Sequence, residues 1–134
     1  MIYIGSLQSL GKRMELMAVV DVVKQRARAV ADQFPGAKIS VDYTRVLDDA
    51  DAVMFVLPHH LHYEAKLNCL AAGTHVLLEK PMANSERQCL EMIEVARKAD
   101  RVLMVAYCMC FHPLIARTKL SILFQTGLLI QRIA

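Results

Sequence analysis

The sequence predicts a single α/β domain built on a doubly wound parallel sheet. Three observations lead to this class. Short apolar runs alternate along the chain with amphipathic stretches of roughly 10–15 residues, which is typical of right-handed β-α-β units. The apolar runs are continuous, as expected for strands buried on both faces of a parallel sheet. The linkers are short, and no internal repeat or low-complexity tract interrupts the 134 residues.

The first half of the chain is expected to contain two strands and a helix. The predicted elements are a strand over 14–20, a helix over 24–34, a strand over 38–41 and one or two helical turns over 44–49. The helix carries its apolar residues at i, i+3, i+4 and i+7, and Pro35 with Gly36 ends it.

The second half continues the alternation. The predicted elements are a strand over 52–57, a helix with inner face Leu61, Ala65, Cys69 and Ala72, a strand over 75–78, a helix over 85–100, a strand over 102–106 and a helix over 113–126. Gly73 is expected to cap the first of these helices, and Ser85 with Gln88 has the form of a capping box for the second.

Composition excludes several classes of protein. A chain of 134 residues with 55% hydrophobic residues has room for one core and is not disordered. No apolar run reaches the roughly 18 residues that span a bilayer, and no secretory signal is evident. The net charge of +3 is too small and too dispersed to indicate nucleic-acid binding. The four cysteines lack zinc-site or redox spacing, so we expect a cytoplasmic protein without structural disulfides.

A charged turn follows the strand at 75–78. Glu79, Lys80 and Pro81 stand where the chain leaves the sheet, and open α/β sheets bind ligands at this carboxyl edge. Proline restricts Lys80 as well as itself, so the turn is stiff, and the Lys80–Pro81 bond is a candidate cis peptide. On these three residues alone, a surface ion pair beside a turn proline is the favoured interpretation.

Asp21 ends the first clear strand. In a dinucleotide fold, an acid at this point accepts hydrogen bonds from the adenosine ribose hydroxyls and repels a 2′-phosphate. Val22 and Val23 bring no cation for such a phosphate, so NAD is favoured over NADP. Aspartate is equally suited to cap the helix that follows, and one residue can serve both roles.

Three histidines follow the strand at 52–57, in the run from Pro58 to His62. A metal site is the less favoured interpretation, because adjacent histidines on an extended loop point apart and no further ligand is evident. We instead expect the helix N-terminus and the histidine side chains to face a polar ligand.

The segment after the last strand carries Tyr107, Cys108 and Cys110. A C-x-C pair is strained as a disulfide, so small side chains that line a pocket are favoured over a reactive thiol pair. Tyr107 could offer its ring or hydroxyl to a cofactor, and core packing is about as good an interpretation.

Together these segments resemble one family, the oxidoreductases named for glucose–fructose oxidoreductase, inositol dehydrogenase and rhizopine catabolism (Gfo/Idh/MocA). The likeness extends from about Leu16 to Ile130. It rests on four segments in matching order, at 18–21, 58–62, 71–82 and 106–113. The second of these is similar to the Pro-Asn-x-x-His loop of the family, and the third to its Glu-Lys-Pro signature.

The resemblance implies a Rossmann-like NAD(P)-binding domain from a dehydrogenase of sugars, cyclitols or related polyols, which transfers hydride to or from nicotinamide. Lys80 would be the catalytic lysine beside the nicotinamide and the substrate hydroxyl. Glu79 would lie near the nicotinamide ribose, and Pro81 would set the turn. The residues expected to bind the cofactor are Asp21, Pro58, His59, His62, Glu79, Lys80, Pro81 and Tyr107, and no metal site is expected.

The chain departs from the family pattern at both ends. The family begins with a strand and a Gly-x-Gly-x-x-Gly turn, whereas only residues 1–13 precede the second strand here. We expect residues 6–12 to be the tail of the first helix, with that strand and turn absent. A shortened strand over 1–5 is the disfavoured alternative, because it leaves too few residues for a crossover. We also expect the antiparallel substrate domain of the family to be absent.

Three functional hypotheses follow. The first is a partial dinucleotide-binding domain over residues 1–134, inactive by itself, which binds NAD and meets a sugar or polyol only with a second domain. The second is a relic without cofactor that serves as an interaction or dimerisation module, since the loss of a central strand exposes the edges of its neighbours and favours a homo-oligomer. A complete enzyme in this chain is the least favoured hypothesis.

Overall fold

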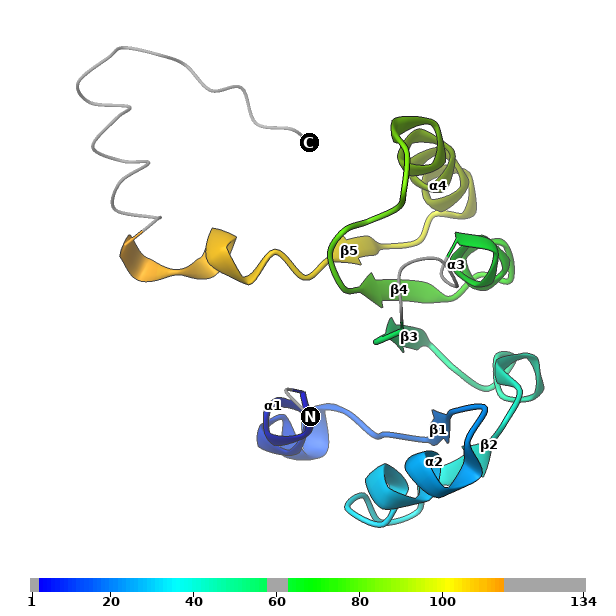
Figure 1. Cartoon of the computed structure of the whole chain (residues 1–134), viewed down its shortest axis with the longest axis vertical. Coiled ribbons are helices and arrows are strands. Elements are labelled where there is room, and N and C mark those ends of the chain that lie inside the picture. Colours follow the sequence, from blue (N-terminus) through cyan, green and yellow to red (C-terminus); the bar gives the residue numbers. More distant parts are fainter. Residues whose placement is uncertain (1–2, 58–62, 115–134) are drawn as a thin grey trace.

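The computed structural model describes residues 3–57 and 63–114 and confirms the predicted α/β class (Figure 1). Helices and strands alternate along the chain. In order, the elements are α1 (Ile4–Ser9), η1 (Gly11–Arg13), β1 (Ala18–Val20), α2 (Lys24–Ala31), β2 (Lys38–Ser40), η2 (Tyr43–Arg45), β3 (Ala52–Phe55), α3 (Tyr63–Ala71), β4 (His75–Leu78), α4 (Glu86–Ala99), β5 (Leu103–Val105) and η4 (Cys108–Phe111).

All strand pairs are parallel, as predicted, but the described strands form two sheets. One sheet has the order β1-β2 and the other β3-β4-β5. Ala18 pairs with Lys38 in the first sheet, and the second aligns Phe55 with Leu78 and Leu78 with Val105. Within the described residues no ladder joins β1 to β3, so these two strands are the edges at which the sheets are not connected.

The N-terminal segment is helical. The helix α1 begins at Ile4, so the shortened strand considered for residues 1–5 does not form over Ile4 and Gly5. The helix ends at Ser9, and a 3-10 turn at Gly11–Arg13 continues it toward β1. The expectation that a helix precedes the second strand of the family pattern is therefore confirmed.

The strand at 75–78 has the predicted bounds, while β1 is shorter than the apolar run that predicts it. The ladder begins only at Met17, whose carbonyl accepts a hydrogen bond from the Lys38 N–H at 2.8 Å. Residues 14–16 precede this first bond, and an apolar run without a partner strand does not become part of a sheet. Of the helix predicted over 113–126, the described residues Pro113 and Leu114 are helical and the rest lie outside the described part.

The helix α4 follows its sequence signals closely. The Ser85 hydroxyl accepts a hydrogen bond from the Gln88 N–H at 3.3 Å. The Gln88 side chain returns to the Asn84 N–H at 3.2 Å rather than to the Ser85 N–H that a capping box predicts. Asp100 ends the helix in the left-handed conformation, with φ 53°. Both ends of α4 are thus satisfied by local contacts.

The core lies between the three-stranded sheet and the helices α3 and α4, which pack on it side by side (Figure 1). Its buried members are Leu47, Phe55, Cys69, Leu70, Val76, Leu78, Met92 and Ala96. The predicted inner face of α3 is correct at Cys69 and wrong at Ala72, which is exposed and lies beyond the last helical residue, Ala71. Each described helix is too short or too polar to span a bilayer.

Candidate functional site

The carboxyl ends of β3, β4 and β5 lie at one level of their sheet. The Glu79 N–H donates to the Phe55 carbonyl at 3.2 Å, and the Ala106 N–H donates to the Leu78 carbonyl at 2.8 Å. The turn that begins at Glu79 therefore emerges next to the segment that carries Tyr107. The parallel ladder brings these two predicted site segments together.

The turn after β4 contains the predicted cis bond between Lys80 and Pro81. Glu79 is half-buried, and its Oε2 accepts a hydrogen bond from the Lys80 N–H at 3.1 Å. Lys80 and Pro81 are exposed. The turn thus holds the Glu79 carboxylate against the backbone, while Lys80 is accessible to a bound molecule.

Tyr3 was not predicted as part of the site. Its hydroxyl donates a hydrogen bond to Oε1 of Glu79, which joins the residue before α1 to the turn after β4. The bond to this carboxylate, with burial as a smaller cause, raises the pKa of Tyr3 to about 12. No local sequence signal indicates this contact, because the two residues are 76 positions apart.

Lys66 is a second residue of this site that is not among the predicted ones. Its side chain is 1% exposed, and Nζ donates a hydrogen bond to the Met82 carbonyl at 3.0 Å. Burial lowers the pKa of Lys66 to about 8. The lysine therefore fixes the chain just beyond Pro81 from the core side. Its place three residues before the buried Cys69 is the helical spacing that could have revealed it.

Asp21 ends β1 as predicted, and its own N–H donates to the Ser40 carbonyl at 3.2 Å. Its Oδ1 accepts hydrogen bonds from the Val23 N–H at 2.7 Å and from Nη2 of Arg26 at 2.9 Å. The Val23 N–H first, and Arg26 with it, lower the pKa of the carboxyl group. Oδ2 accepts no hydrogen bond from the described residues.

The expectation that Asp21 caps the following helix needs correction. The residue that caps α2 is Val23, so Asp21 closes the turn before the helix rather than its first turn. Val22 and Val23 bring no cation to this site, but Arg26, in the first turn of α2, forms an ion pair with Asp21.

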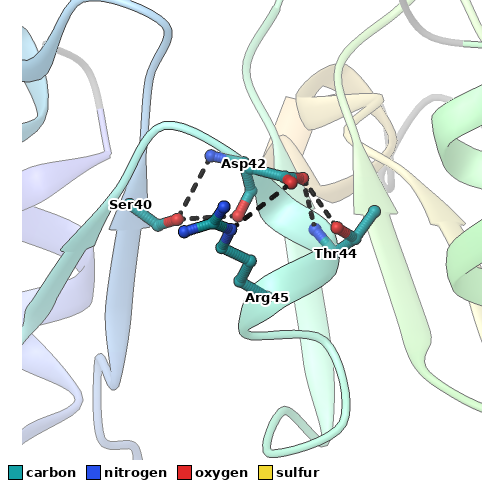
Figure 2. Close-up of polar contacts among 4 residues, drawn as sticks. All are labelled: Ser40, Asp42, Thr44 and Arg45. Carbon is teal, nitrogen blue, oxygen red and sulfur yellow. Dashed lines mark hydrogen bonds and ion pairs between the residues drawn. The ribbon is translucent and has the colours of Figure 1, made fainter.

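A second polar cluster lies at the carboxyl end of β2, next to the end of β1 in the ladder. Figure 2 shows Asp42 at its centre, where Oδ1 accepts hydrogen bonds from the Thr44 N–H at 3.0 Å and from the Thr44 hydroxyl at 2.8 Å. The Thr44 hydroxyl is the main cause that lowers the pKa of Asp42. Ser40 donates to the Asp42 carbonyl at 2.7 Å, and Arg45 lies 3.8 Å from Oδ2. These contacts stabilise the start of η2, and they engage the carboxylate and carbonyl oxygens of Asp42.

Tyr107 is 49% exposed, so the alternative in which it packs in the core is wrong. Cys69, Cys89 and Cys108 are free thiols. Cys108 is exposed, Cys89 is half-buried and Cys69 is buried. Pro58, His59 and His62 lie outside the described residues.

The predicted residues fall into two groups. Glu79, Lys80, Pro81 and Tyr107 share the edge of the three-stranded sheet, while Asp21 lies at the end of the two-stranded sheet. The described contacts of Asp21 are all with its own sheet and α2. Tyr3 is what connects the N-terminal part of the chain to the Glu79 turn.

Comparison with known proteins supplies the family. Residues 2–107 match the model of an oxidoreductase family with an NAD-binding Rossmann fold, Gfo/Idh/MocA. The D-glucoside 3-dehydrogenase of Escherichia coli (strain K12) is 38% identical over 92 residues, which are 67% of this chain and 26% of that protein. The inositol 2-dehydrogenase 2 of Saccharopolyspora erythraea is 32% identical over 114 residues, 83% of this chain and 34% of that protein. The chain thus spans about a third or less of the length of these relatives.

Solved structures are similar in fold as well as in sequence. A 3-ketoreductase from Actinomadura kijaniata, in complex with NADP and TDP-benzene, is 30% identical and superposes with a TM-score of 0.79 over 90% of this chain and 37% of that one. The WlbA dehydrogenase from Bordetella pertussis, in complex with NADH and UDP-GlcNAcA, is 28% identical with a TM-score of 0.71 over 78% of this chain and 30% of that one. On the family match and these likenesses, the chain belongs to the Gfo/Idh/MocA oxidoreductases and corresponds to their NAD-binding Rossmann domain.

Proposed function

We propose that residues 1–134 are one partial nicotinamide-dinucleotide-binding domain from a dehydrogenase of sugars, cyclitols or related polyols, inactive as this chain alone. The observation that carries the proposal is the turn at Glu79–Pro81. It presents an exposed lysine at the carboxyl edge of a parallel sheet, where this fold binds its cofactor, and it is held by Lys66 and Tyr3.

In this proposal Lys80 is the catalytic residue. Its ammonium group would donate a hydrogen bond to the substrate hydroxyl and stabilise negative charge on that oxygen. Glu79 would orient the nicotinamide ribose, and Tyr107 would offer its exposed ring or hydroxyl to the cofactor. Pro58, His59 and His62 complete the proposed set on the strength of the family resemblance. The bound nicotinamide would supply the hydride chemistry.

We favour NAD over NADP as the cofactor. Oδ2 of Asp21 accepts no hydrogen bond from the described residues, so it suits a ribose hydroxyl, and its charge would repel a 2′-phosphate. Arg26 would attract that phosphate, but its guanidinium group is already paired with Oδ1 of Asp21. A 2′-phosphate would have to compete with this carboxylate for the arginine.

Titration of the chain with NADH and with NADPH, followed by nicotinamide fluorescence, tests both the binding of a cofactor and the preference for NAD over NADP. We expect NADH to bind with a Kd on the order of 10 μM and more tightly than NADPH. Asp21→Ala should weaken the binding of NADH about tenfold or more and reduce the preference for NADH over NADPH. Arg26→Ala should weaken the binding of NADPH more than that of NADH. A folded chain that binds neither cofactor at about 1 mM would refute the proposal.

The variant Lys80→Ala tests whether Lys80 has a structural role instead of the proposed catalytic one. Because Lys80 is exposed, its loss should leave the midpoint of thermal unfolding within about 2 °C of the wild type. A large loss of stability would instead identify Lys80 as a structural ion-pair partner.

The second candidate function is an interaction module that no longer binds cofactor. The unjoined edges of β1 and β3 favour it. Self-association without NADH or NADPH binding would support this alternative. In either case we propose a reducing, cytoplasmic location, which the free thiols of Cys69, Cys89 and Cys108 support.

A further inference from the structure

The main chain of the Glu79 turn is anchored independently of Tyr3. The Glu79 N–H donates to the Phe55 carbonyl at 3.2 Å, which ties the start of the turn to β3. At the other end, Nζ of the buried Lys66 donates to the Met82 carbonyl at 3.0 Å. Because both ends are bonded to the three-stranded part, the Tyr3 bond is not required to place the backbone of the turn.

The bond from Tyr3 acts instead on the side chain of Glu79. The Tyr3 hydroxyl donates to Oε1, while the Lys80 N–H donates to Oε2 at 3.1 Å. A glutamate side chain has several rotatable bonds, and ordering it costs conformational entropy. Donors on both oxygens fix where the carboxylate lies and how its plane is turned. Tyr3 supplies one of these two donors from a part of the chain 76 positions away.

Tyr3 is itself held in place. Its carbonyl accepts a hydrogen bond from the Leu7 N–H at 2.9 Å, and its backbone is in the right-handed helical region, with φ −92° and ψ −17°. The side chain is half-buried. The bond to Glu79 raises the pKa of Tyr3 to about 12, so the hydroxyl stays protonated near neutral pH. Tyr3 therefore presents a fixed donor to the carboxylate.

This arrangement is compatible with a bound ribose. A carboxylate can accept about four hydrogen bonds, so a donor on Oε1 does not by itself exclude a ribose hydroxyl. Hydrogen bonds to an ionised acceptor are stronger than those between neutral groups, which favours the ordered side chain. A side chain that is ordered before the ligand arrives does not lose its freedom on binding, and the affinity gains accordingly.

We propose that Tyr3 is a positioning residue, which holds the carboxylate of Glu79 in the orientation that receives the nicotinamide ribose of the cofactor. This inference rests on the proposed function, in which Glu79 orients that ribose. Tyr3 acts through Glu79 rather than by touching the cofactor. Its effect is preorganisation, because the ribose meets a carboxylate that already has its bound orientation.

The test compares NADH with ADP, which lacks the nicotinamide ribose. Both are titrated by calorimetry into the 134-residue chain and into its Tyr3→Phe variant, which keeps the aromatic ring and removes the donor. The binding of NADH should weaken about fivefold in the variant. The Kd of ADP should stay within about twofold of the wild-type value. A merely structural role of Tyr3 would weaken the binding of both ligands together.

A double-mutant cycle shows whether Tyr3 acts through Glu79. Glu79→Ala should weaken the binding of NADH about tenfold, and adding Tyr3→Phe to it should weaken the binding less than about twofold further. Tyr63→Phe is the matched control, because it removes another tyrosine–carboxylate bond, to Glu91, between α3 and α4. Its affinity for NADH should equal that of the wild type.

Four results with a chain that binds NADH would overturn the inference and leave the proposed function standing. One is an unchanged NADH affinity in Tyr3→Phe, and another is equal weakening of NADH and ADP. A third is a higher NADH affinity, which would mean that Tyr3 covers the carboxylate and must leave when ribose binds. The fourth is an equal effect of Tyr3→Phe with and without the Glu79 side chain.

The two levels of the proposal fail in different ways. A folded wild-type chain that binds no NADH at about 1 mM would refute the proposed function, and the role of Tyr3 with it. If ADP binds too weakly to be measured, the double-mutant cycle with NADH decides the role of Tyr3.

Discussion

The two sheets of this protein have the same parallel geometry and very different interiors. The three-stranded sheet is covered by α3 and α4, and it contains Phe55, Val76 and Leu78, none of which is more than 5% exposed. The two-stranded sheet is covered by α2, where Ala27 and Ala31 are the buried residues. Isolated two-stranded sheets are marginal, so the second part depends on its contacts with the rest of the molecule.

This difference has a functional consequence. The proposed catalytic turn at Glu79–Pro81 stands on the well-packed sheet, while the proposed ribose acid Asp21 stands on the poorly packed one. Precise placement is needed where a reacting atom is oriented, and a ribose contact tolerates more motion. The two ends of the proposed dinucleotide site therefore stand on sheets that differ in how well they are packed.

The largest effect is expected from a cavity in the well-packed part. Leu78→Ala should lower the free energy of unfolding by about 3 kcal/mol, because Leu78 is fully buried and its neighbours cannot close the space completely. Val19→Ala in β1 should cost under about 1 kcal/mol, since Val19 is only half-buried. Urea denaturation of both variants measures the contrast. Equal losses would mean that the two parts share one core.

A change of intermediate size is expected at Lys66. Lys66→Met should raise the free energy of unfolding near pH 7 by about 2 kcal/mol, because it removes a buried charge at the cost of the hydrogen bond to Met82. In the wild type this cost is fully present below the folded pKa of about 8 and falls as pH rises toward the unfolded value of 10.5.

The pH dependence provides the check. Wild-type stability should rise by about 1 kcal/mol between about pH 7 and pH 9, and the Lys66→Met variant should lack this rise. The window ends there because burial raises the pKa of Cys69 to about 11, and the stability linked to that thiol is lost as pH rises above 9.0, the pKa of the thiol in the unfolded chain. Lys24→Met, at an exposed lysine, is the control and should keep the wild-type slope. A wild type without any slope would show that Lys66 is charged at no cost.

The smallest effect is expected at the hydrogen bond between Tyr3 and Glu79. Tyr3→Phe should cost at most about 1 kcal/mol, since the hydroxyl is only partly buried. Because Glu79 raises the pKa of Tyr3 to about 12, this stability is present below 10.0, the pKa of tyrosine in the unfolded chain, and is lost as pH rises toward 12. The difference between wild type and variant should therefore shrink from about pH 8 to about pH 11.

A second readout asks whether Tyr3 couples the two sheets. Tyr3→Phe should reduce the cooperativity of urea unfolding, because it releases the N-terminal part from the Glu79 turn. Tyr63→Phe removes another tyrosine–carboxylate bond, to Glu91, but lies entirely within the three-stranded part. It should leave the cooperativity unchanged. If both variants changed the dependence of the unfolding free energy on urea concentration equally, the coupling role of Tyr3 would be refuted.

Much of the fold could be predicted from the sequence because its signals are local. The strand at 75–78 lies between a glycine and a proline turn, and α4 has its own cap at Ser85. The turn at Glu79–Pro81 could be located for the same reason. The length of β1 could not, because strand length depends on which partner is present.

The alternation of elements, the family resemblance and the positions of Asp21, Lys80 and Pro81 at strand ends could be derived from the sequence, because they follow from periodicity, turn residues and motif order. Other features arise only when the chain is folded. The tertiary structure paired Arg26 with Asp21, bonded Lys66 to the Met82 carbonyl, linked Tyr3 to Glu79 and left β1 and β3 without a ladder between them among the described residues. Each of these depends on contacts that only folding brings together, and ion pairs, hydrogen bonds and open sheet edges leave no periodic trace along the chain.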